Sequence, residues 1–154
     1  MVWRGHNWPR LCTVRSPMEI VTTPVGRQVI GCVIEVHRAI GPGVLESMYE
    51  EASAHEFALK GLRFARQVGL PIRYKGLNLG LGYRVDFVIE EELVVELKTV
   101  ERLLPVHDAQ VLTYLRVLNL RQGLLINFNV PLLKRGIKSI LNSHVTDANR
   151  EGAK

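Results

Sequence analysis

The segment that most constrains the fold of this chain is residues 84–98, RVDFVIEEELVVELK. Two runs rich in β-branched and apolar residues, 84–89 and 93–98, flank three consecutive glutamates. Such runs are typical of strands, and a short polar connection between them is typical of a hairpin. We therefore expect a β-hairpin here, and we expect the glutamates at 90–92 to be ordinary solvated charges of its turn.

The polar face of this hairpin carries the residues of chemical interest. Successive side chains of a strand point to opposite faces, so Asp86 of the first run can lie beside Glu96 and Lys98 of the second. Two neighbouring carboxylates repel each other and are costly to desolvate unless a cation joins them. Oxygen ligands suit a hard ion such as Mg²⁺, so one interpretation is a metal site. The other is a surface hairpin with ordinary solvated charges, and both stay open for the segment taken alone.

The length and the charge of the chain limit the possible partners. A chain of 154 residues fits one domain with one core, and 47% hydrophobic with 23% charged residues is ordinary for a folded protein. The formal charge of +5 suggests a nucleic-acid partner. However, three arginines near the N-terminus supply +3 of it, and the remaining chain carries only +2. Basicity alone is therefore weak support for a polyanionic substrate.

Cysteine usage and hydropathy indicate the compartment. The two cysteines, Cys12 and Cys32, make no disulfide framework and are expected to be free thiols in a reducing compartment. The uncharged run at 123–133 is too short to span a bilayer. The N-terminus has neither a continuous apolar stretch nor a cleavage site of small residues. We therefore expect a cytoplasmic protein without a membrane partner.

Two helices are predicted before the hairpin. Thr23 and Pro24 supply an N-cap hydroxyl and a proline at the first helical position. Apolar residues then recur at helical spacing until Gly41, where the helix is expected to end. A second helix is expected from about residue 44 to 60, with Glu46 in its first turn. An acid there interacts favourably with the helix dipole by about 0.3–1 kcal/mol, so helix capping alone would account for Glu46.

Beyond the second helix, the pattern predicts mainly strands and one further helix. Besides the hairpin, the expected elements are a strand at 64–73, a short run at 77–79, a turn at 80–82, a helix from Pro105 to about residue 120, a strand at 123–128, and a strand or short helix at 132–141. The main elements then follow the order α-α-β-β-β-α-β. We expect a single domain over 18–141, with a disordered extension at 1–17 and a polar tail at 142–154.

Several motifs in this order resemble those of the PD-(D/E)XK nuclease superfamily, whose core is α-β-β-β-α-β. Asp86 matches the first acid of its signature, and Glu96-Leu97-Lys98 matches the E-x-K element. Gln110 and Tyr114 resemble the Q-x-x-x-Y helix motif of the exonuclease-like branch. The residue before Asp86 is valine where the superfamily name records proline, at a position that varies widely in the superfamily.

Within the superfamily, the chain is most similar to small bacterial proteins known as GxxExxY proteins. Gly43, Glu46 and Tyr49 stand at the positions of that signature. The resemblance covers about residues 20–141, which is nearly everything except the two tails.

The resemblance implies a fold, a chemistry and a site. The fold is α/β with a mixed sheet: a single-domain, restriction-endonuclease-like αβββαβ core with an extra N-terminal helix. The chemistry is hydrolysis of phosphodiester bonds in nucleic acid, with DNA as the expected partner and Mg²⁺ or Mn²⁺ as the cofactor. The implied catalytic residues are Glu46, Asp86, Glu96, Lys98, Gln110 and Tyr114, and the implied metal ligands are Asp86, Glu96, Glu46 and the backbone carbonyl of Leu97.

Substrate recognition is less defined by the sequence. Arg84 and Arg73 are candidates for contacts with phosphate groups, although exposed arginines on strands are usually just solvated. Without an appended domain in this chain, recognition is expected to rest on backbone and shape or on a homo-oligomer. The alternative function is a non-hydrolytic module that binds nucleic acid or a protein partner on the same scaffold. An unrelated metal-binding enzyme is a more distant alternative.

Overall fold

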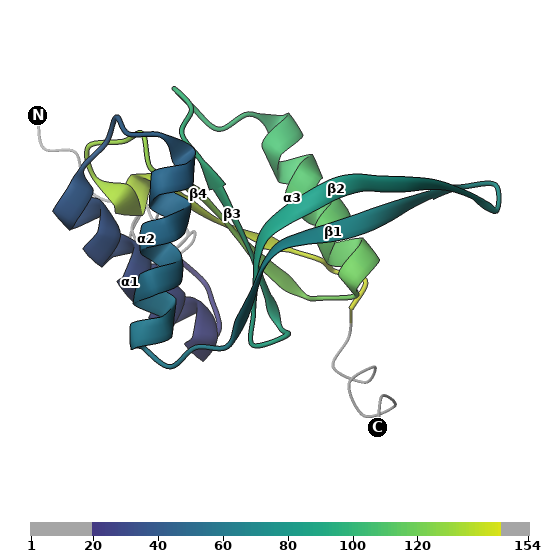
Figure 1. Cartoon of the computed structure of the whole chain (residues 1–154), viewed down its shortest axis with the longest axis horizontal. Helices are drawn as coiled ribbons and strands as arrows, with labels where there is room; N and C mark the ends of the chain where they lie inside the picture. The colour runs from purple at the N-terminus through teal and green to yellow at the C-terminus, as the bar shows by residue number, and fades with distance from the viewer. Residues whose placement is uncertain (1–19, 146–154) are drawn as a thin grey trace, which may run out of the picture.

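The computed structural model describes residues 20–145 (Figure 1). The predicted extension at 1–17 and most of the predicted tail at 142–154 lie outside the described residues. In chain order the elements are α1 (Pro24–Ile40), α2 (Glu46–Leu59), β1 (Phe64–Tyr74), β2 (Leu77–Ile89), β3 (Leu93–Lys98), α3 (Pro105–Leu118), β4 (Gln122–Asn127), the 3₁₀ turn η1 (Leu133–Gly136) and β5 (Ile137–Leu141). Within this part of the chain, the helices are all too short or too polar to cross a membrane.

The five strands form one mixed sheet in the order β1-β2-β3-β4-β5. Neighbouring strands are antiparallel except β3 and β4, which are parallel and are joined through α3. The predicted mixed sheet and the extra N-terminal helix are therefore confirmed. The segment at 132–141, for which a strand and a short helix were both open, forms η1 followed by β5.

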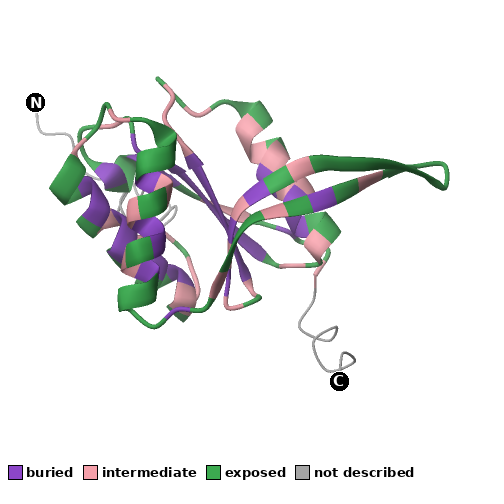
Figure 2. Cartoon of the chain, viewed as in Figure 1, coloured by how far each residue is buried: buried purple, intermediate pink, exposed green. Residues whose placement is uncertain are grey.

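The sheet lies between two helical layers (Figure 1). On one face, α1 and α2 enclose a core that includes the buried side chains of Val33 and Phe57. On the other face, α3 packs through Val111 and Leu115. β4 is buried along its whole length (Figure 2), as its nearly continuous apolar pattern predicts. β3 and β4 are therefore packed on both faces, and this packing positions the polar end of β3.

The start of α1 follows the sequence prediction. The hydroxyl of Thr23 accepts a hydrogen bond from the backbone N–H of Gly26 at 3.1 Å, and Pro24 is the first helical residue. This cap satisfies one of the N–H groups that a helix leaves without a partner in its first turn.

β1 and β2 form a two-stranded ribbon that extends beyond the rest of the sheet (Figure 1). The ribbon turns at Lys75 and Gly76, whose φ angles of 46° and 79° suit the two-residue turns of hairpins. The turn predicted at 80–82 is wrong, because these residues continue β2. Gly80 has a φ of 89°, and the register of the ribbon is irregular there. A glycine in a β-bulge and a glycine in a turn give the same sequence signal, which explains the error.

Candidate active site

The site is built where β2 separates from β3. The two strands pair from Ile89↔Leu93 to Phe87↔Val95 and no further. At the next position, the backbone N–H of Leu97 donates to Oδ2 of Asp86 at 2.8 Å, and the backbone N–H of Asp86 lies 3.4 Å from Oε2 of Glu96. Each carboxylate therefore accepts from the backbone of the opposite strand, in place of a carbonyl of the ladder. The hairpin brings Asp86 and Glu96 together, as strand pairing predicts.

Lys98 is the cation next to this pair. Its Nζ donates to Oε1 of Glu96 at 3.0 Å, and the two side chains are 16% and 4% exposed. Two carboxylates and one amine thus converge at one point, and the local charge is negative when all three groups are ionised.

The pKa values of both carboxyl groups reflect this imbalance. Burial, and after it the charge of Asp86, raise the pKa of Glu96 to about 7, although Lys98 opposes the shift. Burial also raises the pKa of Asp86, while the N–H of Leu97 opposes it. Because desolvation disfavours the charged form of a carboxyl group, the pair favours either a proton or an additional cation.

Glu46 approaches the same point from the first turn of α2. It is an exposed residue, yet partial burial of its carboxyl group and the charge of Asp86 raise its pKa, while Lys98 and the backbone N–H of Thr99 lower it. These causes place the carboxylate within electrostatic range of Asp86 and Lys98. Among residues 20–145, no group of three or more His, Cys, Asp or Glu side chains is arranged so that it could hold a metal ion.

The loop before α2 explains how Glu46 is held. The hydroxyl of Tyr49 donates to the carbonyl of Gly41 at 2.5 Å and lies 3.4 Å from the backbone N–H of Val44. The Tyr49 ring is buried and stacks on Phe128 with 4.3 Å between ring centroids. The tyrosine of the G-x-x-E-x-x-Y motif therefore anchors the turn before its glutamate, and the motif glycine, Gly43, has a φ of 97° in that turn, a conformation that favours glycine.

The carbonyl of Leu97 points toward the open side of β3. The N–H and C=O groups of one residue in a strand lie on the same edge, and the N–H of Leu97 reaches Asp86 on the side where β2 has separated. The next carbonyl, that of Lys98, accepts from Phe128 on the opposite side. The orientation of Leu97 is compatible with its predicted place among the metal ligands.

Gln110 and Tyr114 of α3 support the separated strand. The side-chain amide of Gln110 donates to the hydroxyl of Tyr114 at 2.6 Å, and that hydroxyl lies 3.4 Å from the carbonyl of Arg84 in β2. Burial and the charge of Glu96 raise the pKa of Tyr114, so its hydroxyl stays neutral. The pair therefore links α3 to the part of β2 that has separated from β3.

Two residues near the site were not among the predicted ones. In β1, Gln67 has a φ of 51°, an uncommon conformation for a residue other than glycine. Its amide lies 2.8 Å from Oε2 of Glu50 and 3.3 Å from Oδ1 of Asp86, and Arg66 bonds to the other carboxylate oxygen of Glu50. Glu50 could have been found as the residue one helical turn after Glu46. The sequence carries no signal for Gln67.

The two predicted phosphate contacts are far apart. Arg84 is exposed and lies two residues before Asp86. Arg73 pairs with Asn78 in the outer part of the ribbon, which is about 25 Å from Asp86 at the rise of an extended strand. A single phosphate next to Asp86 therefore cannot contact both arginines.

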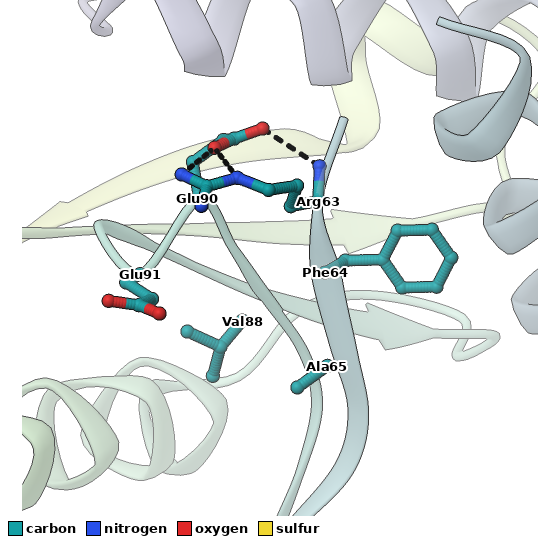
Figure 3. A pocket seen from close by; sticks show the side chains of 6 residues that line it. All are labelled: Arg63, Phe64, Ala65, Val88, Glu90 and Glu91. Atoms are coloured by element: carbon teal, nitrogen blue, oxygen red, sulfur yellow. Dashed lines mark hydrogen bonds and ion pairs between the residues drawn. The ribbon is translucent and has the colours of Figure 1, made fainter. Parts of the chain in front are cut away.

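A surface pocket at the β2–β3 turn is separate from the site (Figure 3). It is lined by Arg63, Glu90 and neighbouring side chains, and Arg63 and Glu90 form an ion pair with 2.8 Å between Nη2 and Oε2. These charges neutralise each other, and the pocket holds none of the predicted site residues. An exposed pair of this kind contributes little to stability.

Comparison with known proteins identifies a family. A family model described as the PD-(D/E)XK nuclease superfamily matches residues 23–140, from the cap of α1 into β5. Among solved structures, one titled Crystal structure of SSO0001 is similar at 16% sequence identity over 83% of this chain and 81% of that chain, with a TM-score of 0.39. Curated proteins give no significant match. The family match confirms the predicted restriction-endonuclease-like fold class.

Proposed function

Because the chain belongs to the PD-(D/E)XK nuclease superfamily, we propose that it hydrolyses phosphodiester bonds of DNA in a reaction that requires Mg²⁺ or Mn²⁺. Membership implies nuclease-type chemistry on nucleic acid, and nucleases of this superfamily generally use divalent metal ions. The observation that carries the proposal for this chain is the pair Asp86 and Glu96. Each carboxylate accepts a hydrogen bond from the backbone of the other residue's strand, and the nearby positive charge of Lys98 does not balance their two negative charges. We further propose that the chain is one of the GxxExxY proteins, because Gly43, Glu46 and Tyr49 form the motif of that family.

The donor atoms fit a hard dication. Asp86 and Glu96 would hold the ion with the carbonyl of Leu97, and Glu46 would contribute a further carboxylate, directly or through water. All of these ligands are oxygens, as Mg²⁺ and Mn²⁺ prefer. When bound, such an ion polarises a phosphoryl oxygen and lowers the pKa of water.

The residues of the chain itself would then orient and stabilise the reacting groups. Lys98 places a compact positive charge beside Glu96, where it can offset negative charge that develops on the phosphoryl oxygens in the transition state. Its ion pair keeps the amine in position before the substrate arrives, so little reorganisation is needed. Tyr114 and Gln110 would keep β2, and with it Asp86, at a fixed distance from β3.

Removal of Lys98 tests the mechanism. Cleavage of single- and double-stranded DNA and RNA is measured with Mg²⁺, with Mn²⁺ and with EDTA. Lys98→Ala should bind metal and nucleic acid like the parent but cleave more slowly by about two orders of magnitude, as when one preorganised charge-stabilising donor is removed. Lys138→Ala is the matched control, because Lys138 also pairs with a carboxylate, that of Asp108, and lies on β5, two strands from Glu96.

The outcomes separate the two functions. Parental turnover in Lys98→Ala would contradict the assigned role of the lysine. If the parent binds nucleic acid or a protein but cleaves nothing with either metal, the alternative function, a non-hydrolytic module, replaces the nuclease.

A further inference from the structure

The ribbon of β1 and β2 is the part of the molecule that the proposed site leaves unexplained. β2 pairs with β3 only over residues 87–89, so the outer part of the ribbon has only its own two strands (Figure 1). Along that outer part, nearly every residue is exposed (Figure 2). A two-stranded hairpin is marginally stable in water, so such an extension indicates a surface that a partner covers.

The end of the ribbon exposes large apolar side chains. Tyr74 and Leu77, which pair next to the turn, are 59% and 60% exposed, and Leu79 and Leu81 are 58% and 76% exposed. Single exposed apolar residues need no explanation, but several gathered on one projecting element mark an interaction site.

The charge of the ribbon indicates which partner fits. Residues 67–85 contain three basic side chains, Arg73, Lys75 and Arg84, and no Asp or Glu. Among residues 20–145, none of the three forms an ion pair with a carboxylate. Two identical ribbons packed side by side would bring like charges together, which is unfavourable. A polyanion complements the ribbon along its length.

The shape of the ribbon indicates that the polyanion is a B-form duplex. The major groove of B-DNA admits a two-stranded β-ribbon, whereas the major groove of duplex RNA is too deep and narrow for side chains to read. From Asp86 to the turn at Gly76, β2 extends about 33 Å, which is close to the length of one turn of B-DNA, about 34 Å. The ribbon begins at the site itself, so a duplex that holds the ribbon in its groove also passes close to Asp86 and Glu96.

We propose that the outer ribbon lies in a groove of double-stranded DNA about one helical turn from the scissile phosphate, with Arg73 and Lys75 on the phosphate backbone. This inference rests on the proposed nuclease function and specifies its substrate as duplex DNA. The exposed apolar side chains at the tip contact base edges in the major groove, where the thymine methyl group is an apolar partner.

The test is the salt dependence of binding to a duplex of 30 base pairs, in EDTA so that cleavage does not interfere. The ribbon variant carries Arg73→Ala and Lys75→Ala, and the control carries Lys134→Ala and Arg135→Ala, an exposed basic pair in η1. Each phosphate contact contributes about 0.9 to the slope of log K against log salt. The ribbon variant should therefore have a slope lower by about 2 and a Kd raised at least tenfold, while the control behaves like the parent. Circular dichroism checks that both variants fold.

Each outcome has a defined meaning. If the ribbon variant and the parent bind the duplex with the same slope while the parent cleaves DNA, the ribbon inference is wrong and the nuclease proposal stands. If the parent neither binds nor cleaves nucleic acid, both are wrong. If the ribbon variant loses only self-association in sedimentation, the ribbon is a contact between copies of this chain and the inference is overturned. An equal loss of affinity for duplex RNA would also contradict it.

Discussion

Glu96 is expected to make the metal-free protein less stable as the pH rises. A carboxyl group whose pKa is higher in the folded than in the unfolded state contributes stability that is fully present below the unfolded pKa and is lost as the pH rises through the folded pKa. For Glu96 these limits are 4.5 and about 7. The shift corresponds to about 3 kcal/mol, because the side chain is only 4% exposed and little solvent screens it.

Glu96→Gln removes this dependence. Relative to the parent, the variant should gain about 3 kcal/mol in free energy of unfolding between pH 5 and pH 8, or about 6–12 °C in Tm for a chain of this size. The protonation of Asp86 acts in the same direction, because the two groups share the titration. Urea unfolding followed by circular dichroism at several pH values, in EDTA, measures the difference. Glu91→Gln, in the exposed β2–β3 turn, is the control.

The pH trend is the decisive quantity, since any change in packing that Glu96→Gln makes shifts the stability by the same amount at every pH, whereas the titration of Glu96, which already includes its ion pair with Lys98, does not. A stability difference that is equal at pH 5 and pH 8 would refute the assignment of the raised pKa to Glu96. Saturating Mg²⁺ should restore the stability of the parent near pH 8 and leave the variant unchanged.

Three further predictions concern the neighbours of Glu96. Asp86→Asn should abolish the calorimetric heat of Mg²⁺ binding while the fold survives, and equal heats in variant and parent would remove Asp86 from the site. Glu46→Gln should lower metal affinity or cleavage; a change of only tenths of a kcal/mol in stability, with affinity and cleavage kept, would return Glu46 to helix capping. Gln67→Gly should be more stable than Gln67→Ala by about 1 kcal/mol, because Gly tolerates a positive φ, and both should lower cleavage; equal stability in urea unfolding would argue against strain at Gln67.

The sequence predicted the central pair of acids because strand alternation and hairpin pairing are local rules. They place Asp86 beside Glu96 without any knowledge of the rest of the fold. The separation of the strands at that point could not be predicted, since the β2 backbone there contacts α3, at Tyr114, and local strand rules contain no information about that helix. Gln67 was missed for a similar reason, because its contacts with Glu50 and Asp86 come from other elements and its own residue type does not indicate them. The glycines at 80 and 82 misled the prediction because they fit a turn and a bulge equally well.

The carboxylate of Asp86 accepts a hydrogen bond from the backbone N–H of Leu97, and this structural role is independent of any reaction. Without an acceptor at position 86, a buried N–H of β3 would lose its partner, at a cost of about 1–3 kcal/mol. Asparagine can replace the acceptor, whereas alanine cannot. We therefore expect a related protein without catalytic activity to keep Asp or Asn at position 86, whereas other residues can replace Lys98. In sequences of this kind, the lysine is the better marker of activity, and the aspartate also marks the architecture.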